Sequence, residues 1–216
     1  MHQVLLIAAR GLAHGKQRLS GVLDAPARSA LNRRWLTHVL AVARSQCTDT
    51  LHLAVVSPDP DTLAFAEAAG AIPIAEMQLA GLNQALTWAR AQLQLRGARY
   101  MTVLPADLPY LEPADVRALL DGPHHQVVIA PDLADRGTNG LGIPIGPDSL
   151  HGRQFPFAFG PDSCTAHHRA ALAVGLQVRV VKRRGLQCDI DTPQDLDDWQ
   201  RSVAAIAPEL KAEAAS

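Results

Sequence analysis

Three aspartates stand where a carboxylate could hold a metal ion against phosphate. Asp107 lies in Pro-Ala-Asp-Leu-Pro, directly after an apolar run that predicts a strand over 100–104. Asp189 and Asp191 alternate along Asp-Ile-Asp, and side chains two residues apart share one face of an extended segment. Two like charges that lie close together favour a cation beside them. We therefore expect the three aspartates to hold a divalent cation, with helix capping as the alternative role for Asp107.

A basic, glycine-containing loop follows the first predicted strand, over 4–8. Its sequence, Ala-Ala-Arg-Gly-Leu-Ala-His-Gly-Lys-Gln-Arg-Leu-Ser, includes Arg10, Gly11, Lys16 and Arg18. Glycines let backbone amides approach a phosphate, and lysine and arginine neutralise it. The loop is not a P-loop, because its two glycines are one residue too close and a glutamine follows the lysine. We predict that it binds nucleotide phosphates, the alternative being a solvated basic loop.

Three further segments carry groups that could contact a ligand. Gly-Leu-Asn-Gln-Ala-Leu opens a predicted helix, where Gly81 and Asn83 are candidates for contact with a base or ribose. Gly-Thr-Asn places Thr138 in a predicted connection between strands. Phe-Ala-Phe-Gly-Pro-Asp-Ser places Gly160 and Ser163 at the start of another helix, whose free amides favour an anion. The alternatives are a plain helix start for the first segment and core packing for the phenylalanines of the third.

The histidines and cysteines indicate no further chemistry. His167 and His168 are adjacent on a predicted helix and cannot face one metal ion, and we assign no catalytic role to any histidine. Cys47, Cys164 and Cys188 are odd in number and far apart, without the spacing of a disulfide framework or a zinc site. This usage fits a reducing cytoplasm.

The elements that position these residues follow from short apolar runs alternating with amphipathic stretches. Strands are expected over 4–8, 51–56, 72–75, 100–104, 127–130, 141–145 and 178–181, and helices after Asp24 and over 62–69, 82–95, 113–120, 163–174 and 192–204. This alternation predicts an α/β fold with a mostly parallel sheet covered on both faces. Ligands of such sheets lie at the carboxyl ends of the strands, where both charged clusters fall. We expect one domain over 1–205 and a frayed tail over 206–216.

Composition narrows the range of partners. The chain has 216 residues, 48% of them hydrophobic, which is enough for the core of one domain. A net charge of −1 argues against a nucleic-acid partner, which needs a positive excess to replace counterions. No apolar run approaches the roughly 18 residues of a membrane span. No charged leader with a small-residue cleavage site precedes the first strand, so we predict a cytoplasmic protein with no membrane partner.

Five of these segments, in this order, resemble the CofC/FbiD family, the guanylyltransferases of deazaflavin coenzyme F(420) biosynthesis. They are Gly-Leu-Asn-Gln-Ala-Leu, Pro-Ala-Asp-Leu-Pro-Tyr-Leu, Gly-Thr-Asn, Phe-Gly-Pro-Asp-Ser and Asp-Ile-Asp-Thr-Pro-Gln-Asp-Leu, within a resemblance that runs over 4–199. The resemblance implies a three-layer Rossmannoid, glycosyltransferase-A-like nucleotidyltransferase fold. It also implies transfer of GMP from GTP to the phosphate of 2-phospho-L-lactate, phosphoenolpyruvate or 3-phospho-D-glycerate, with release of pyrophosphate, and suggests a homodimer.

The resemblance also implies a role for each matched residue. Mg²⁺ would be held by Asp107, Asp189 and Asp191. The nucleotide would be bound by Arg10, Gly11, Lys16, Gly81 and Asn83, and the acid would be bound by Thr138, Gly160 and Ser163. The catalytic residues would be Asp107, Lys16 and Arg18.

The chain departs from the family at two places. Ala8-Ala9-Arg10 stands where family members often have Pro-x-Lys, and 148–156 resembles a variable insert near the acid site. Two other functions stay open. A related nucleotidyltransferase acting on a sugar phosphate or pterin would share the aspartates. A non-catalytic nucleotide-binding module would not need them.

Overall fold

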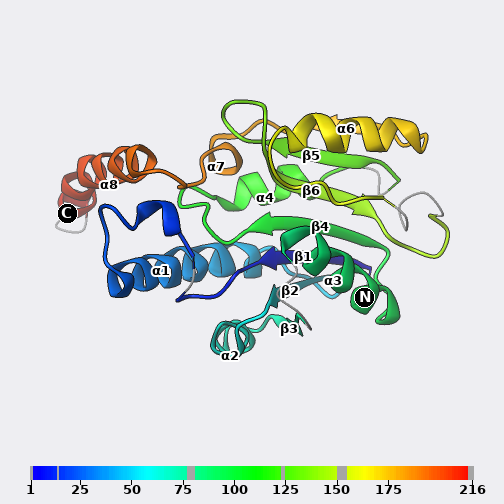
Figure 1. Cartoon of the computed structure of the whole chain (residues 1–216), viewed down its shortest axis with the longest axis horizontal. Helices are drawn as coiled ribbons and strands as arrows, with labels where there is room; N and C mark the ends of the chain where they lie inside the picture. The colour runs from blue at the N-terminus through cyan, green and yellow to red at the C-terminus, as the bar shows by residue number, and fades with distance from the viewer. Residues whose placement is uncertain (1, 14, 77–80, 123–124, 150–154, 214–216) are drawn as a thin grey trace.

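The fold is a three-layer α/β sandwich around one sheet (Figure 1). The structure is a computed structural model that describes residues 2–13, 15–76, 81–122, 125–149 and 155–213. The sheet has seven strands in the order β3-β2-β1-β4-β6-β5-β7. All neighbouring strands are parallel except that β6 runs antiparallel to both β4 and β5. The predicted mostly parallel α/β fold is confirmed.

The strands fall close to their predicted positions. They are β1 Gln3–Ala8, β2 Leu51–Ser57, β3 Ile72–Ala75, β4 Tyr100–Pro105, β5 Val127–Pro131, β6 Thr138–Pro144 and β7 Val178–Val180. The helices are α1 Ala25–Arg44, α2 Pro60–Ala68, α3 Leu82–Leu95, α4 Pro113–Leu120, α6 Ser163–Ala173, α7 Arg184–Gln187 and α8 Pro193–Glu213, with a 3-10 turn at Gln17–Leu19. Among these described helices, none has the length and apolar character that crossing a bilayer requires.

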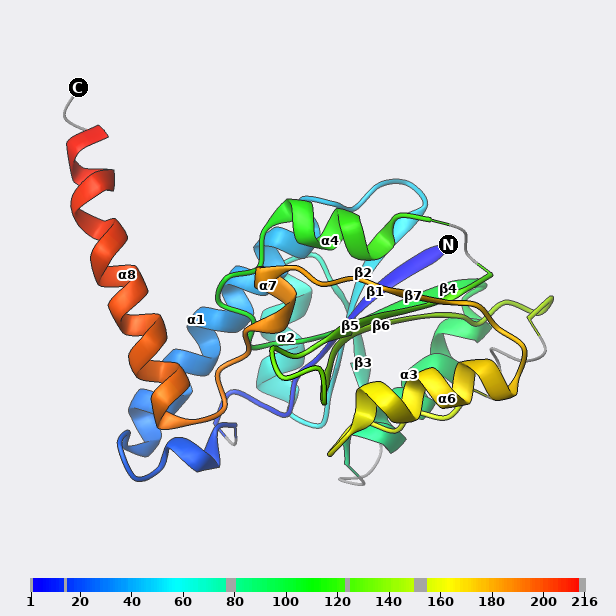
Figure 2. The same ribbon diagram turned by 90° about the horizontal axis from the view of Figure 1, so that it is seen from above.

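Alternation along the central strand β1 divides the core into two layers. Leu5 and Ile7 pack on one face with α1, α2, α4 and α7, while Val4 and Leu6 pack on the other with α3 and α6. Figure 2 shows these two groups of helices on opposite sides of the sheet. Since successive strand side chains point to opposite faces, the unbroken apolar run of β1 is what a strand buried on both faces requires.

Helix α8 lies outside the two main layers and is anchored by a small aromatic cluster. Trp199 of α8 packs edge-on against Trp35 of α1, with ring centroids 5.5 Å apart. Thr192 and Asp195 cap this helix, since the backbone N–H of each is donated to the other's side chain. This cluster fixes the start of α8 and, with it, the preceding segment that contains Asp189 and Asp191. The helix extends to Glu213, beyond its predicted end at Ala204.

Two local expectations need correction. Thr138, predicted to lie in a connection, belongs to β6, which begins three residues before the predicted strand 141–145. The helix predicted over 163–174 begins at Ser163 but ends one residue early at Ala173, and its N-cap is Asp162, in a left-handed conformation and without a side-chain capping bond. Within the insert 148–156, residues 150–154 lie outside the described residues. The predicted Asp24 cap of α1 is confirmed, because its carboxylate accepts the N–H of Ala27.

Candidate active site

One cavity opens at the carboxyl ends of β1, β2 and β4, where ligands of parallel sheets bind. Its volume is about 920 Å³, within the range of small-molecule sites. Nine of the twelve residues predicted for the site line it. They are Arg10, Gly11, Lys16, Arg18, Gly81, Asp107, Thr138, Asp189 and Asp191. The topology thus brings together the basic first loop and the three aspartates, which are far apart in the sequence.

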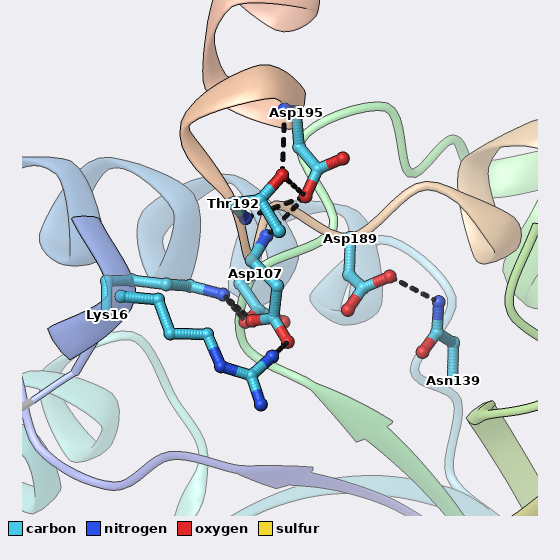
Figure 3. A network of polar contacts seen from close by, with 8 residues as sticks. Lys16, Asp107, Asn139, Asp189, Thr192 and Asp195 are labelled. Atoms are coloured by element: carbon cyan, nitrogen blue, oxygen red, sulfur yellow. Dashed lines mark hydrogen bonds and ion pairs between the residues drawn. The ribbon is translucent and has the colours of Figure 1, made fainter. Parts of the chain in front are cut away.

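Lys16 joins the basic loop to the acidic residues. Its ammonium group contacts the Asp107 carboxylate (Figure 3). The same group lies 3.0 Å from Oδ1 of Asp191. Two oxygens that contact one nitrogen are at most about 6 Å apart, twice a typical hydrogen-bond length. Asp107 and Asp191 are therefore within reach of a shared magnesium ion or a two-metal cluster.

The environment keeps Lys16 charged. Its side chain is 8% exposed, and burial alone would lower the pKa of the ammonium group. The charges of Asp107 and Asp191 outweigh burial and raise that pKa. Arg18 also contacts Asp191, with Nη1 3.2 Å from Oδ2, but its side chain is 74% exposed and water screens this pair.

Asp189 lies beside this group with a different partner. Its Oδ1 accepts a hydrogen bond of 3.1 Å from the amide of Asn139 (Figure 3). Burial, followed by the negative charge of Asp107, raises the pKa of Asp189 to about 6 despite that hydrogen bond. Within the described part of the chain, no three His, Cys, Asp or Glu side chains are grouped closely enough to hold a metal ion by themselves. Among the described residues the three aspartates therefore do not form one cluster, and Lys16 contacts two of them, while magnesium binding itself stays a prediction.

The donor set nevertheless fits magnesium. Oδ1 of Asp107 is buried and has no hydrogen-bond partner within the described residues. A buried carboxylate oxygen without a partner costs free energy, and a bound cation would remove that cost. Magnesium commonly takes one or two carboxylates and completes its shell with water and substrate phosphates, so three converging aspartates are not required. Asp107 and Asp191 supply that minimum.

A tight contact shapes the first loop. Gly11 has a φ of +118°, and a Cβ at this position would lie 3.0 Å from the Cβ of Asp59. Asp59 caps α2 by accepting the N–H of Thr62, whose Oγ1 accepts the N–H of Leu12 at 3.1 Å. Burial would raise the pKa of Asp59, but hydrogen bonds to its carboxylate, first from the Thr62 hydroxyl and then from backbone N–H groups, outweigh burial and lower that pKa. A glycine is therefore needed where the loop turns against the start of α2.

Asn83 does not line the cavity, contrary to its predicted nucleotide contact. Its side-chain amide pairs with the backbone of Phe159, donating to the carbonyl at 3.1 Å and accepting the N–H at 2.8 Å. Both functions of the amide are thereby used inside the protein. Asn83 instead holds Phe159, which does line the cavity, while the nearby Gly81 lines it directly.

Gly160 and Ser163 also lie outside the cavity lining that the structure describes. Ser163 is only 1% exposed, so its hydroxyl is not accessible to a ligand in this conformation. Gly160 is exposed at the turn before α6. Asp162 points to solvent, and its Oδ1 accepts a hydrogen bond from Nε of Arg136 at 2.9 Å. Of the three residues predicted to hold the acid, only Thr138 faces the cavity.

Three residues that bear on the cavity were not predicted from the sequence, of which Asn32 and Asp59 line it. Asn32, in the middle of α1, donates to the carbonyl of Leu12 at 3.0 Å and so holds the first loop. Asp59 carried a weak signal, since an Asp-Pro after a strand with threonine three residues later is typical of a helix start. His167, given no role from the sequence, contacts Thr138 with its Nδ1 at 3.1 Å.

Known proteins resemble this chain in sequence and in fold. The family described as "Guanylyl transferase CofC like" matches residues 3–199. The phosphoenolpyruvate guanylyltransferase of Rubrobacter xylanophilus is 39% identical over 193 residues, covering 88% of this chain and 90% of that protein. The 3-phospho-D-glycerate guanylyltransferase of Phenylobacterium zucineum is 35% identical, with coverage of 88% and 84%. A nucleotidyl transferase from Methanothermobacter superposes with a TM-score of 0.63 at 16% identity, covering 93% and 99%, which supports the fold.

Proposed function

The chain belongs to the CofC-like guanylyl transferase family, and from that premise we propose that it transfers GMP from GTP to the phosphate of a three-carbon phospho-acid. Phosphoenolpyruvate is the first candidate acceptor because it appears in the names of several relatives, with 3-phospho-D-glycerate and 2-phospho-L-lactate next. The product would serve the assembly of deazaflavin coenzyme F(420). The observation that carries the proposal is the contact of Lys16 with Asp107 and Asp191 inside one cavity.

The proposed reaction joins two polyanions. A phosphate oxygen of the acid attacks the α-phosphorus of GTP, the bond from that phosphorus to the bridging oxygen breaks, and pyrophosphate leaves. The nucleophile is already an anion, so no general base is needed. The site must therefore align the two substrates and neutralise their charge, which are the contributions that positioning and fixed cations provide.

The basic side chains of the cavity suit this task. An ammonium group has three N–H donors, and the described contacts of Lys16 use two of them, which leaves one for a phosphate oxygen. Arg10 and Arg18 line the same cavity and would stabilise charge on the departing pyrophosphate. Magnesium held by Asp107 and Asp191, with Asp189 beside them, would neutralise and align the phosphates.

The acid is proposed to bind near Thr138, whose side chain faces the cavity. Gly160 and Ser163 stand at the start of α6, and they would take part only if the turn before that helix moved towards the ligand. Gly81 and the loop after β1 remain the proposed contacts of GTP. A cytoplasmic location and a homodimer are also part of the proposal.

A pyrophosphate-release assay tests the function. The purified protein is incubated with Mg²⁺, each of the four nucleoside triphosphates and each of the three phospho-acids in turn. We expect release only with GTP, and only when one of the acids is present. Release with CTP and a sugar phosphate instead would favour the related nucleotidyltransferase. No release under any combination would favour a nucleotide-binding module.

A further inference from the structure

A short irregular segment, 155–159, reaches the cavity wall at Phe159 and is held by polar side chains of α3 and α6. Arg90 of α3 donates from Nη1 to the carbonyl of Phe155 at 2.6 Å. Asn83 of α3 pairs with the backbone of Phe159. His167 of α6 accepts the N–H of Ala158 at 3.0 Å through Nε2. Three side chains therefore hold the backbone of this segment.

The hydrogen bond from Ala158 determines where His167 carries its proton. A backbone N–H can only donate, so Nε2 must be the unprotonated, accepting nitrogen of the ring. His167 is 0% exposed, and burial lowers its pKa to about 4, so the ring is neutral near neutral pH. When Nε2 of a neutral histidine is unprotonated, the single ring proton lies on Nδ1.

The proton on Nδ1 determines the direction of the hydrogen bond between His167 and Thr138. Nδ1 of His167 lies 3.1 Å from Oγ1 of Thr138, so the ring donates and the hydroxyl oxygen accepts. The hydroxyl proton of Thr138 is then available to another acceptor, and Thr138 lines the cavity. Phosphate and carboxylate oxygens only accept hydrogen bonds, so a hydroxyl held in this state is matched to an anion.

We infer that His167 is a positioning residue that holds the Thr138 hydroxyl as a hydrogen-bond donor to an anionic oxygen of the phospho-acid. This inference rests on the proposed function for the identity of the ligand. The arrangement of His167, Thr138 and Ala158 is independent of it. Packing supports the fixed orientation, because the rings of Phe155 and Phe159 lie with centroids 6.0 and 4.8 Å from the imidazole.

The first test reads the tautomer and needs no turnover. Nitrogen-15 NMR of the histidine-labelled protein at neutral pH distinguishes a ring protonated at Nδ1 from one protonated at Nε2. The signal of His167 is assigned by its loss in His167→Asn. We expect a neutral ring protonated at Nδ1 with an unprotonated Nε2. A proton on Nε2 would overturn the inference, whatever the enzyme's substrate.

The second test separates positioning from packing by kinetics with phosphoenolpyruvate. Thr138→Val removes the hydroxyl at similar size, and His167→Leu removes the donor to it. Each should raise KM for the acid by roughly ten- to hundredfold, the value of a hydrogen bond to a charged group. KM for GTP should change by less than about twofold, a difference below 0.5 kcal/mol. A rise in KM for GTP alone would place the hydroxyl on the nucleotide and overturn the inference.

Conservative variants and their combination serve as controls. Thr138→Ser keeps a hydroxyl, and His167→Asn keeps an N–H donor near the position of Nδ1, so both should retain a KM for the acid near that of the unmodified protein. Combining Thr138→Val with His167→Leu should add little to Thr138→Val alone, since both act through one hydroxyl. Thermal unfolding identifies variants that merely lose stability. Folded His167→Leu with an unchanged KM for the acid would contradict the inference.

Failure of the inference and failure of the proposed function give different results. If the unmodified protein turns over none of the three acids, the proposed function fails, and the NMR experiment still decides the state of His167. If turnover occurs and Thr138→Val leaves KM for the acid unchanged, the function stands and the inference fails.

Discussion

Nζ of Lys16 lies 3.0 Å from Oδ1 of Asp191, a contact that joins the loop after β1 to the segment before α8 across 175 residues of sequence. The same ammonium group contacts Asp107 at the end of β4. One side chain therefore connects three separate parts of the cavity wall. It also places a permanent positive charge where two polyanionic substrates are proposed to meet.

Loss of Lys16 should be far more damaging than loss of Arg18. We expect Lys16→Met to lower kcat/KM by roughly a hundred- to thousandfold, the usual cost of removing one group that stabilises transition-state charge. Arg18→Met is the matched control, because Arg18 contacts the same Asp191 from an exposed position. Its loss should be about tenfold or less, since solvent weakens an exposed pair. Steady-state pyrophosphate release measures kcat/KM of both variants. Equal losses would contradict the greater importance assigned to Lys16.

The metal proposal predicts that Asp107→Asn and Asp191→Asn abolish turnover while leaving the fold intact. Asparagine keeps the size of each side chain and removes the charge that a divalent cation requires. Turnover is measured across a magnesium titration, and manganese binding is followed by electron paramagnetic resonance. Asp197→Asn, on the exposed surface of α8, is the control and should bind the metal normally. Unchanged manganese affinity in Asp107→Asn would exclude that residue as a ligand.

Base selection can be tested with ITP and ATP beside GTP. Guanine has an O6 acceptor and an N2 donor, hypoxanthine keeps only O6, and adenine has neither. Each group of the site that is left unpaired costs about 1–3 kcal/mol, so kcat/KM should fall at least about fivefold for ITP and further for ATP. The three values come from one initial-rate assay with a fixed acid. Equal kcat/KM for GTP and ATP would remove guanine recognition from the proposal.

The buried His167 predicts a pH dependence of stability. Its pKa is about 4 in the folded protein, against 6.5 for the free side chain. Above pH 6.5 the ring of His167 is unprotonated in both the folded and the unfolded protein. As the pH falls towards 4, the unfolded chain binds a proton at this ring before the folded protein does. The free energy of unfolding should therefore fall by about 3 kcal/mol as the pH falls from 6.5 to 4, because of this one histidine.

Urea unfolding from pH 4 to pH 7 measures this dependence. His167→Gln cannot titrate and should show a shallower loss of stability on acidification than the unmodified protein. His168→Gln is the matched control, since His168 is the exposed neighbour on α6. A steeper or equal loss in His167→Gln would show that His167 is not held neutral.

The sequence predicted the parts of the site that depend on strand order. Asp107 and Lys16 follow apolar runs, and carboxyl ends of parallel strands meet at one edge of the sheet, so their proximity could be foreseen. Their direct contact could not be foreseen, because it depends on the path of the first loop, in which Lys16 adopts a left-handed conformation with φ of 58°. The first loop has no pattern that signals this conformation.

The predictions that needed correction concern side-chain direction. Asn83 and Ser163 lie at the starts of helices, where sequence alone suggested exposure to a ligand. In the structure Asn83 pairs with the backbone of Phe159, and Ser163 is buried. Helix position fixes which face a residue occupies, but the neighbour on that face comes from a segment distant in sequence.

The most direct test of the central claim is phosphorus-31 NMR of the product formed from GTP, Mg²⁺ and phosphoenolpyruvate. Attack by the acid's phosphate on the α-phosphorus predicts two mutually coupled doublets from a new P–O–P bond, with one pyrophosphate released per product. A single uncoupled monoester resonance from free GMP would contradict guanylyl transfer to the phosphate. A product in which the acid's own phosphate keeps its uncoupled monoester signal would contradict it as well.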